Sequence, residues 1–229
     1  MARTARNVVL AAATLGAAQA GAAGAQSFNL DFGSGLSGPP STYAAAGVAG
    51  HWNALPAAHG TTTTGLIDVD GAVTGASLRQ IGGLALVDFP DPAISGDDAL
   101  LMHDFLVTYD EDLESCIFLE QMQPGTYEVL IYARMPNPLV LSYTSVDQEP
   151  GVPYSSVGGV WPGAHAPLVS YSRHLARVDF TGWLYLHSGI VPGYDPLLGA
   201  ALNGLQVRLA SFADGFESGD TSAWSAAVP

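Results

Sequence analysis

The residues best suited to catalysis do not show the spacing of a known catalytic motif. The six histidines never lie two or four positions apart, and no G-x-S-x-G elbow, H-E-x-x-H zinc motif or phosphate-binding loop occurs. A zinc site assembled from distant strands stays open. Cys116 is the only cysteine, and its setting in "SCIFLEQM" is typical of a small buried hydrophobic residue, with a nucleophile or an intermolecular bridge as alternatives. We therefore assign no catalytic residue.

Carboxylates provide the best remaining route to catalysis. Glycoside hydrolysis needs two carboxyl groups about 5 to 10 Å apart. Glu120 and Glu128 flank the Pro124-Gly125 turn, so they would lie close together if their strands formed a hairpin. The other interpretation is two acidic side chains on a solvent-exposed face. A carboxylate-dependent hydrolase or lyase acting on glycans is thus an alternative function.

Metal ligands are not identified by the sequence, although a structural calcium ion stays open. Residues 109–115, "YDEDLES", hold four acidic side chains, but they lack the glycine and the terminal glutamate of an EF-hand loop. Asp68 and Asp70 form a D-x-D pair, but a hairpin turn at Asp70-Gly71 already explains the second of these residues. No other cofactor is expected.

Aromatic side chains in one long segment are the best candidates for ligand binding. Residues 147–167 are rich in proline and glycine and show no strand pattern, which predicts a long and functional loop. Tyr154, Trp161 and His165 lie within it, and sugars stack on aromatic faces. The alternative is that Trp161 folds back and plugs one end of the domain. Trp52 and Trp183 lie in or beside strand-like runs and are expected in the core.

Short alternating runs predict the elements that hold these side chains. In residues 127–133 the odd-numbered positions are apolar and fall on one face, which is typical of a half-buried strand. Similar runs recur between turn signals, and only residues 95–106 favour a short helical turn. We predict an all-β domain, a single β-sandwich or barrel of about nine strands.

The order of the motifs resembles a known family. "FNLDFG" is followed by "GVAGHWN", "GLIDVDGAVTGASL", "DDALLMHDFL", "MQPGTYEVLIYA" and finally "ALNGLQVRL". This series, over roughly residues 27–211, resembles the galactose-binding-like jelly rolls of exported bacterial proteins. The resemblance implies a jelly-roll sandwich. The ending "DGFESGDTSAWS" resembles short tails of other secreted bacterial proteins rather than the membrane-spanning sorting tail that many family members carry.

The first residues predict export. Arg3 and Arg6 precede an apolar run from Val8 to about Ala18, and Ala23-Gly24-Ala25 matches the small-x-small cleavage pattern. Residues 1–25 are therefore predicted to be a signal peptide, since the apolar run is shorter than the roughly 20 residues that span a bilayer. Residues 26–211 would form the domain and residues 212–229 a flexible tail. The mature protein is expected outside the cell or in the periplasm, without membrane insertion.

The charge of the chain restricts its partners. The formal charge is −14 at pH 7, and two of the seven basic residues belong to the predicted signal peptide. Such a surface repels phosphate backbones, so nucleic acid is not expected as a partner. A glycan or another neutral ligand suits this surface better, and the oligomeric state is not predicted. The sequence thus favours an exported non-catalytic binding or surface module, with the hydrolase or lyase and a purely structural or adhesive protein as alternatives.

Overall fold

The computed structural model describes most of the predicted domain. The signal peptide predicted for residues 1–25 and the tail predicted for residues 212–229 lie outside the described residues. No helix in the described part of the chain is long and apolar enough to cross a membrane. The described ranges are 26–33, 38–55, 58–83, 85–109, 114–149, 154–193 and 199–210.

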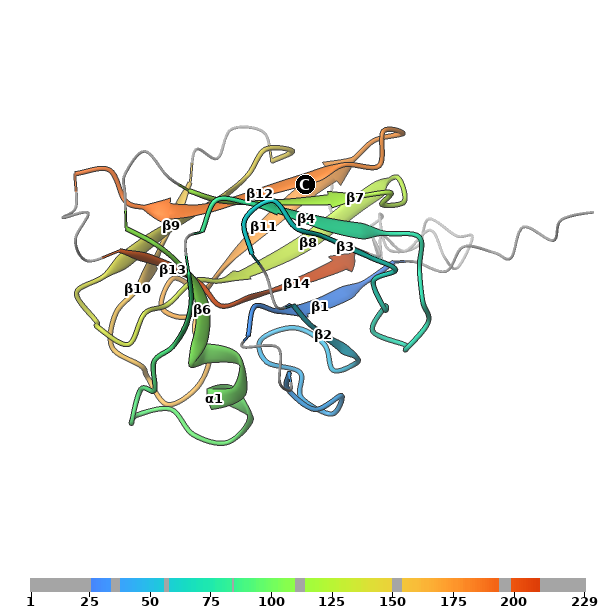
Figure 1. The fold of residues 1–229 in the computed structure, drawn as a ribbon. Coiled ribbons are helices and arrows are strands. Elements are labelled where there is room, and N and C mark those ends of the chain that lie inside the picture. Colours follow the sequence, from blue (N-terminus) through green and yellow to red (C-terminus); the bar gives the residue numbers. More distant parts are fainter. Residues whose placement is uncertain are drawn as a thin grey trace, which may run out of the picture.

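The chain folds into two large β-sheets and one small one (Figure 1). Sheet A has five strands in the order β11 (Tyr171–Val178), β8 (Gly125–Tyr132), β14 (Gly204–Leu209), β1 (Phe28–Asp31) and β2 (Trp52–Ala54). Sheet B has six, in the order β10 (Ser155–Gly158), β9 (Leu141–Val146), β12 (Leu184–Ile190), β7 (Ser115–Glu120), β4 (Ser77–Ile81) and β3 (Thr62–Thr64). Sheet C has three, in the order β13 (Ala200–Leu202), β6 (Asp104–Thr108) and β5 (Ala85–Asp88).

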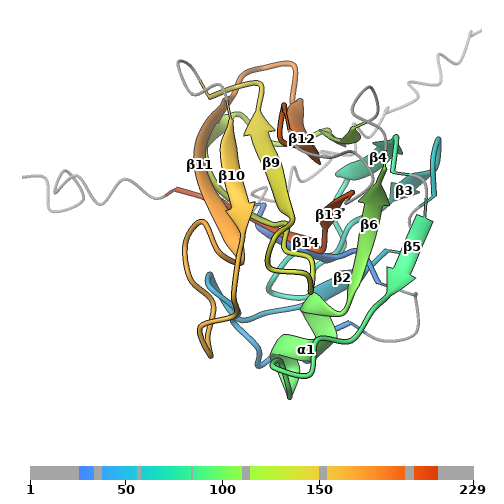
Figure 2. The same ribbon diagram turned by 90° about the vertical axis from the view of Figure 1, so that its left-hand side faces the viewer.

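The prediction of an all-β sandwich is confirmed, with more strands than the nine expected. The described residues contain strands β1 to β14 and one short helix, α1 (Asp97–Met102). This helix leads into β6, which lies beside β5 (Figure 2). Several of the additional strands have only three or four residues, too few to show a clear alternation. One of them, β10, lies within residues 147–167, where the sequence predicted no strand.

The main core lies between sheets A and B. Strand β8 shows how the alternation creates it, because Tyr127, Val129 and Ile131 are fully buried against residues of sheet B. Strands β7 and β11 and the first half of β12 alternate in the same way, and their contributions to this core are Ile117, Leu119, Ala176, Val178, Leu184 and Leu186. In Figure 1, β12, β7 and β4 lie above β14 and β1, with α1 below.

A second core covers one end of the outer face of sheet A. The strand β8 was predicted to be half-buried, but Leu130 and Tyr132 on its second face are also buried. They pack with residues of α1, with Trp52 and with Trp161. The second face is covered because loops and α1 fold over it, which local alternation does not reveal.

Candidate functional site

The predicted binding residues are brought together only in part. Trp161 is 8% exposed and belongs to the second core. The ring of His165 meets it edge-on, with centroids 5.2 Å apart. His165 Nε2 lies 2.7 Å from the Tyr43 hydroxyl and 3.3 Å from Asp98 Oδ1. Burial is the main cause that lowers the pKa of His165, opposed by the negative charge of Asp98. These contacts tie the loop to the sandwich.

Trp161 has little free surface for a ligand. The guanidinium of Arg134 lies over its ring, 5.8 Å from the centroid, and Arg134 is itself paired with Asp91 at 2.8 Å. Tyr154 is separate, 42% exposed, and its nearest aromatic neighbour is Tyr143 of sheet B at 5.9 Å. The prediction that these loop residues contact a ligand remains a prediction, and the burial of Trp161 makes it an inner support of the fold.

Three aromatic side chains lie instead on the outer face of sheet B, one of them exposed and two half-buried. Strands β7 and β12 bury one set of side chains in the core and turn Phe118 and Tyr185 outward, directly opposite each other in the strand register. Their rings pack edge to face, with centroids 4.8 Å apart. Trp183 precedes β12, is 49% exposed, and lies 5.9 Å from Tyr185 with an interplanar angle of 36°. We call Phe118, Trp183 and Tyr185 the aromatic platform.

Charged groups border the platform on its β4 side. Arg79 lies opposite Phe118 in the register of β4 and β7, and its guanidinium sits over the phenyl ring, 4.6 Å from the centroid. Arg79 Nη2 also bonds Glu120 Oε1 at 3.1 Å. Arg79 thus lies over the Phe118 ring, and the ion pair can offer hydrogen-bond donors and acceptors to a ligand on Trp183 and Tyr185.

The prediction that Trp183 lies in the core is wrong. Leu184 takes the core position at the start of β12, so Trp183 falls on the outer face with Tyr185. The alternation in "GWLYLHS" contained this signal, because its leucines mark the buried phase. Trp52 is buried as predicted.

A polar cluster adjoins the platform two register positions along, at the next pair on the same face. His187 of β12 lies opposite Cys116 of β7, and Glu114 directly precedes β7. Burial, and then the negative charge of Glu114, raises the pKa of the Cys116 thiol to about 12. The thiolate is the reactive form of cysteine, and both effects disfavour it at Cys116.

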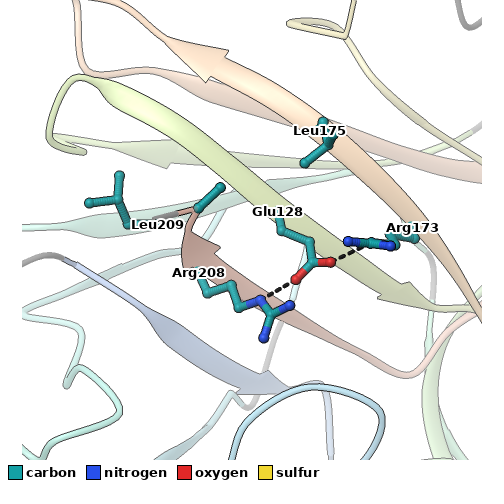
Figure 3. A pocket seen from close by; sticks show the side chains of 6 residues that line it. Glu128, Arg173, Leu175, Arg208 and Leu209 are labelled. Carbon is teal, nitrogen blue, oxygen red and sulfur yellow. Dashed lines mark ion pairs between the residues drawn. The ribbon is translucent and has the colours of Figure 1, made fainter. Parts of the chain in front are cut away.

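A groove of about 280 Å³ lies on the outer face of sheet A, beyond the end that the second core covers. Figure 3 shows Glu128 at its floor between Arg173 and Arg208, from β8, β11 and β14. The Glu128 carboxylate pairs with both guanidinium groups and the residue is only 4% exposed. The Glu128 charge is therefore neutralised by neighbours within the sheet, and Leu175 and Leu209 form the apolar part of the lining. The ion pairs in this groove link the three strands.

Glu120 and Glu128 do not lie on paired strands, so the hairpin required for a catalytic carboxylate pair does not form. Glu120 ends β7 in sheet B, whereas Glu128 lies on β8 in sheet A, and these two strands do not pair. The chain crosses between the sheets at the Pro124-Gly125 turn because the core lies between them. The two carboxylates thus lie on the outer faces of opposite sheets.

The calcium candidates receive no support from the described residues. Residues 110–113 of the acidic stretch lie outside them. At the D-x-D pair, Asp68 Oδ1 accepts a hydrogen bond from the amide of Asp70 at 2.8 Å, and Gly71 has a φ of 88°. The turn therefore accounts for the Asp68 side chain without a metal ion. A structural calcium ion remains a prediction.

Comparisons with known proteins place the chain in no family. No protein-family model matches it, and no curated protein does. Among solved structures, the plant receptor-like kinase ANX2 is 14% identical, with a TM-score of 0.35, over 82% of this chain and 48% of that chain. The enzymatically active domain of tailspike protein 4 from bacteriophage CBA120 is 10% identical, with a TM-score of 0.23, over 58% and 18%. The chain thus spans about half of the first and under a fifth of the second, and neither likeness assigns a function.

Proposed function

We propose that this protein is an exported, non-catalytic binding module that holds a neutral glycan against the aromatic platform of sheet B. The sandwich would be of the galactose-binding-like type, as the order of its sequence motifs suggests. The platform uses a sheet face, where the rings come from or beside paired strands rather than from a long loop. Rigid elements position binding groups better than loops do.

The exposure of Trp183 beside Tyr185 is the observation that supports this proposal best. A tryptophan that is 49% exposed has a large apolar surface in water, and its ring is tilted only 36° from that of its neighbour. Such a surface is unfavourable unless something covers it. The apolar C–H face of a pyranose ring covers it while its hydroxyl groups remain free for Arg79 and Glu120.

The charges favour a neutral ligand over an anionic one. Arg79 is the cation at this platform, and it is already paired with Glu120. The chain as a whole carries a formal charge of −14, which repels anionic polysaccharides. A neutral oligosaccharide avoids this repulsion and needs only stacking and hydrogen bonds.

A glycan array probed with the full exported protein tests the proposal. Specific binding of a neutral glycan without turnover supports it, provided that Trp183→Ala weakens the interaction. Phe89→Ala is the matched control, because Phe89 is also an exposed aromatic residue and follows β5, away from the platform. Turnover of a bound glycan would favour the hydrolase or lyase instead. No binding to any glycan would leave a structural or adhesive protein.

A further inference from the structure

Three different metal-binding side chains converge next to the platform. Cys116 and His187 face each other across the paired strands β7 and β12, and Glu114 lies at the start of β7. One ligand atom from each of the three lies within 4.8 Å of the other two. The donors are a sulfur, an imidazole nitrogen and a carboxylate oxygen, which is a ligand set for zinc rather than for calcium.

The separations match those around a tetrahedral ion. His187 Nδ1 lies 3.4 Å from Cys116 Sγ and 3.3 Å from Glu114 Oε1. Zinc bonds of about 2.3 Å to sulfur and about 2.0 to 2.1 Å to nitrogen and oxygen imply neighbouring ligands about 3.6 and about 3.3 Å apart at tetrahedral angles. Two of the three ligand separations are therefore close to the tetrahedral values, and the third is within 4.8 Å.

Two further residues orient these ligands. Asp147 directly follows β9, and its Oδ1 lies 2.9 Å from His187 Nε2. The Tyr143 hydroxyl donates to Glu114 Oε2. A Cβ at Gly189 would lie 2.6 Å from Tyr143 Cε1, so glycine there lets this ring lie across β12. Outer carboxylate and hydroxyl partners of this kind are typical of metal-bound histidine and carboxylate groups.

The three ligand atoms also lie around a shared space. His187 Nδ1 has Cys116 Sγ and Glu114 Oε1 as neighbours, and either a proton or a metal ion can lie between these atoms.

We infer that Glu114, Cys116 and His187 form a binding site for a zinc-type divalent transition metal, with a fourth position open to water. This site goes beyond the proposed glycan binding and does not depend on it. Binding converts the Cys116 thiol to a thiolate, so one proton leaves to solvent for each ion bound. The ion would join β7 to β12 on the outer face, beside the platform.

Direct metal binding tests the site in the unmodified protein. Since Cys116 is the only cysteine, a thiolate-to-metal charge-transfer absorption with Co²⁺ reports on one sulfur. We expect Co²⁺ at one equivalent to give this absorption, and Zn²⁺ at one equivalent to abolish it by displacement. No charge-transfer absorption at saturating Co²⁺ would overturn the inference.

Variants separate the ligands from their surroundings. Cys116→Ala should abolish the charge-transfer absorption, and His187→Gln should reduce Zn²⁺ affinity beyond measurement. Asp147→Asn should weaken binding about 10- to 100-fold, as for other outer partners. Glu120→Gln is the control, since it changes a carboxylate on the same strand and face outside the cluster. Equal Zn²⁺ affinity in the wild type and in a folded Cys116→Ala variant, checked by circular dichroism, would place the metal elsewhere and refute this site.

Discussion

Among single residues, Trp161 and Trp183 differ in their surroundings. Trp161 is packed under Arg134 in the second core, and Trp183 lies open on sheet B. We expect alanine at Trp161 to change stability, and alanine at Trp183 to change affinity if the proposed function holds.

We predict that Trp161→Ala lowers the free energy of unfolding by about 3–5 kcal/mol, because it leaves a cavity in a buried cluster. Trp183→Ala should cost less than about 1 kcal/mol and weaken glycan binding by about 0.5–1.5 kcal/mol, or roughly two- to tenfold. Thermal denaturation and titration with the glycan found on the array measure both effects. A folded Trp161→Ala variant with wild-type stability and lost binding would return the site to the long loop.

A buried carboxyl group makes stability depend on pH. Asp31 is 2% exposed and its Oδ1 has no hydrogen-bond partner. A Cβ at Gly33 would lie 3.1 Å from Asp104 Oδ2 and 3.2 Å from Asp31 Oδ2, so the two carboxylates approach each other there. Burial, and then the charge of Asp104, raises the pKa of Asp31 from 3.8 to about 8. The folded protein therefore keeps a proton here that the unfolded chain has lost.

Stability should consequently fall as the pH rises from about 4 to about 8, and this contribution should level off above that range. Asp31→Asn removes the titrating group, so its melting temperature relative to wild type should rise between pH 5 and pH 8. Melting curves of both proteins at the two pH values measure the difference. The same offset at both pH values would show that Asp31 ionises normally in the fold.

At the scale of elements, the ion pairs of Glu128 join three strands of sheet A. The carboxylate lies on the central strand β8 and reaches Arg173 on β11 and Arg208 on β14. The carboxylate is buried, whereas the two arginine side chains are 63% and 41% exposed. Loss of the negative charge thus leaves two cations that water can still solvate.

We predict that Glu128→Gln destabilises the protein by about 1–3 kcal/mol, the range for hydrogen bonds to charged groups. This is less than the loss expected when a fully buried charge is left unpaired. Glu120→Gln is the control, because its pair with Arg79 is partly exposed and should contribute at most about 1 kcal/mol. Urea unfolding at pH 7 compares them, and equal losses would contradict a special role for Glu128.

At the scale of the whole molecule, the first described residue is already part of the fold. Gln26 is buried, and its Oε1 accepts the amide of Gln123 at 2.8 Å. It lies shortly before β1, which pairs with β14 and β2 in sheet A. Cleavage after Ala25 would therefore leave every described contact intact. We predict that the exported protein begins at Gln26 or within a few residues of it.

N-terminal sequencing of the secreted protein checks this prediction. The melting temperature of a chain expressed from Gln26 onward serves as a control, since it should equal that of the exported protein. An intact Met1 terminus recovered in the membrane fraction would contradict the predicted processing.

Local patterns in the sequence are enough to indicate an all-β fold and the buried face of its longer strands. Alternation is a local property of the chain, so residues 127–133 and "GWLYLHS" indicate which side chains face the core. Turn and cap signals predicted the turn at Asp70-Gly71 and a helical turn over residues 95–106, of which Asp97–Met102 form α1 and residues 104–106 belong to β6. Local patterns missed the three-residue strands, because so short a segment has no measurable period.

Which strands lie side by side, and what covers them, depends on contacts between residues distant in the sequence. β7 pairs with β12 rather than with the adjacent β8, and this pairing alone brings Cys116 to His187 and Phe118 to Tyr185. Such pairing follows from the burial of side chains distant in sequence, which no local pattern encodes. For the same reason Trp161 is buried although its loop is rich in glycine: the surface that covers it comes from α1, Arg134 and β8.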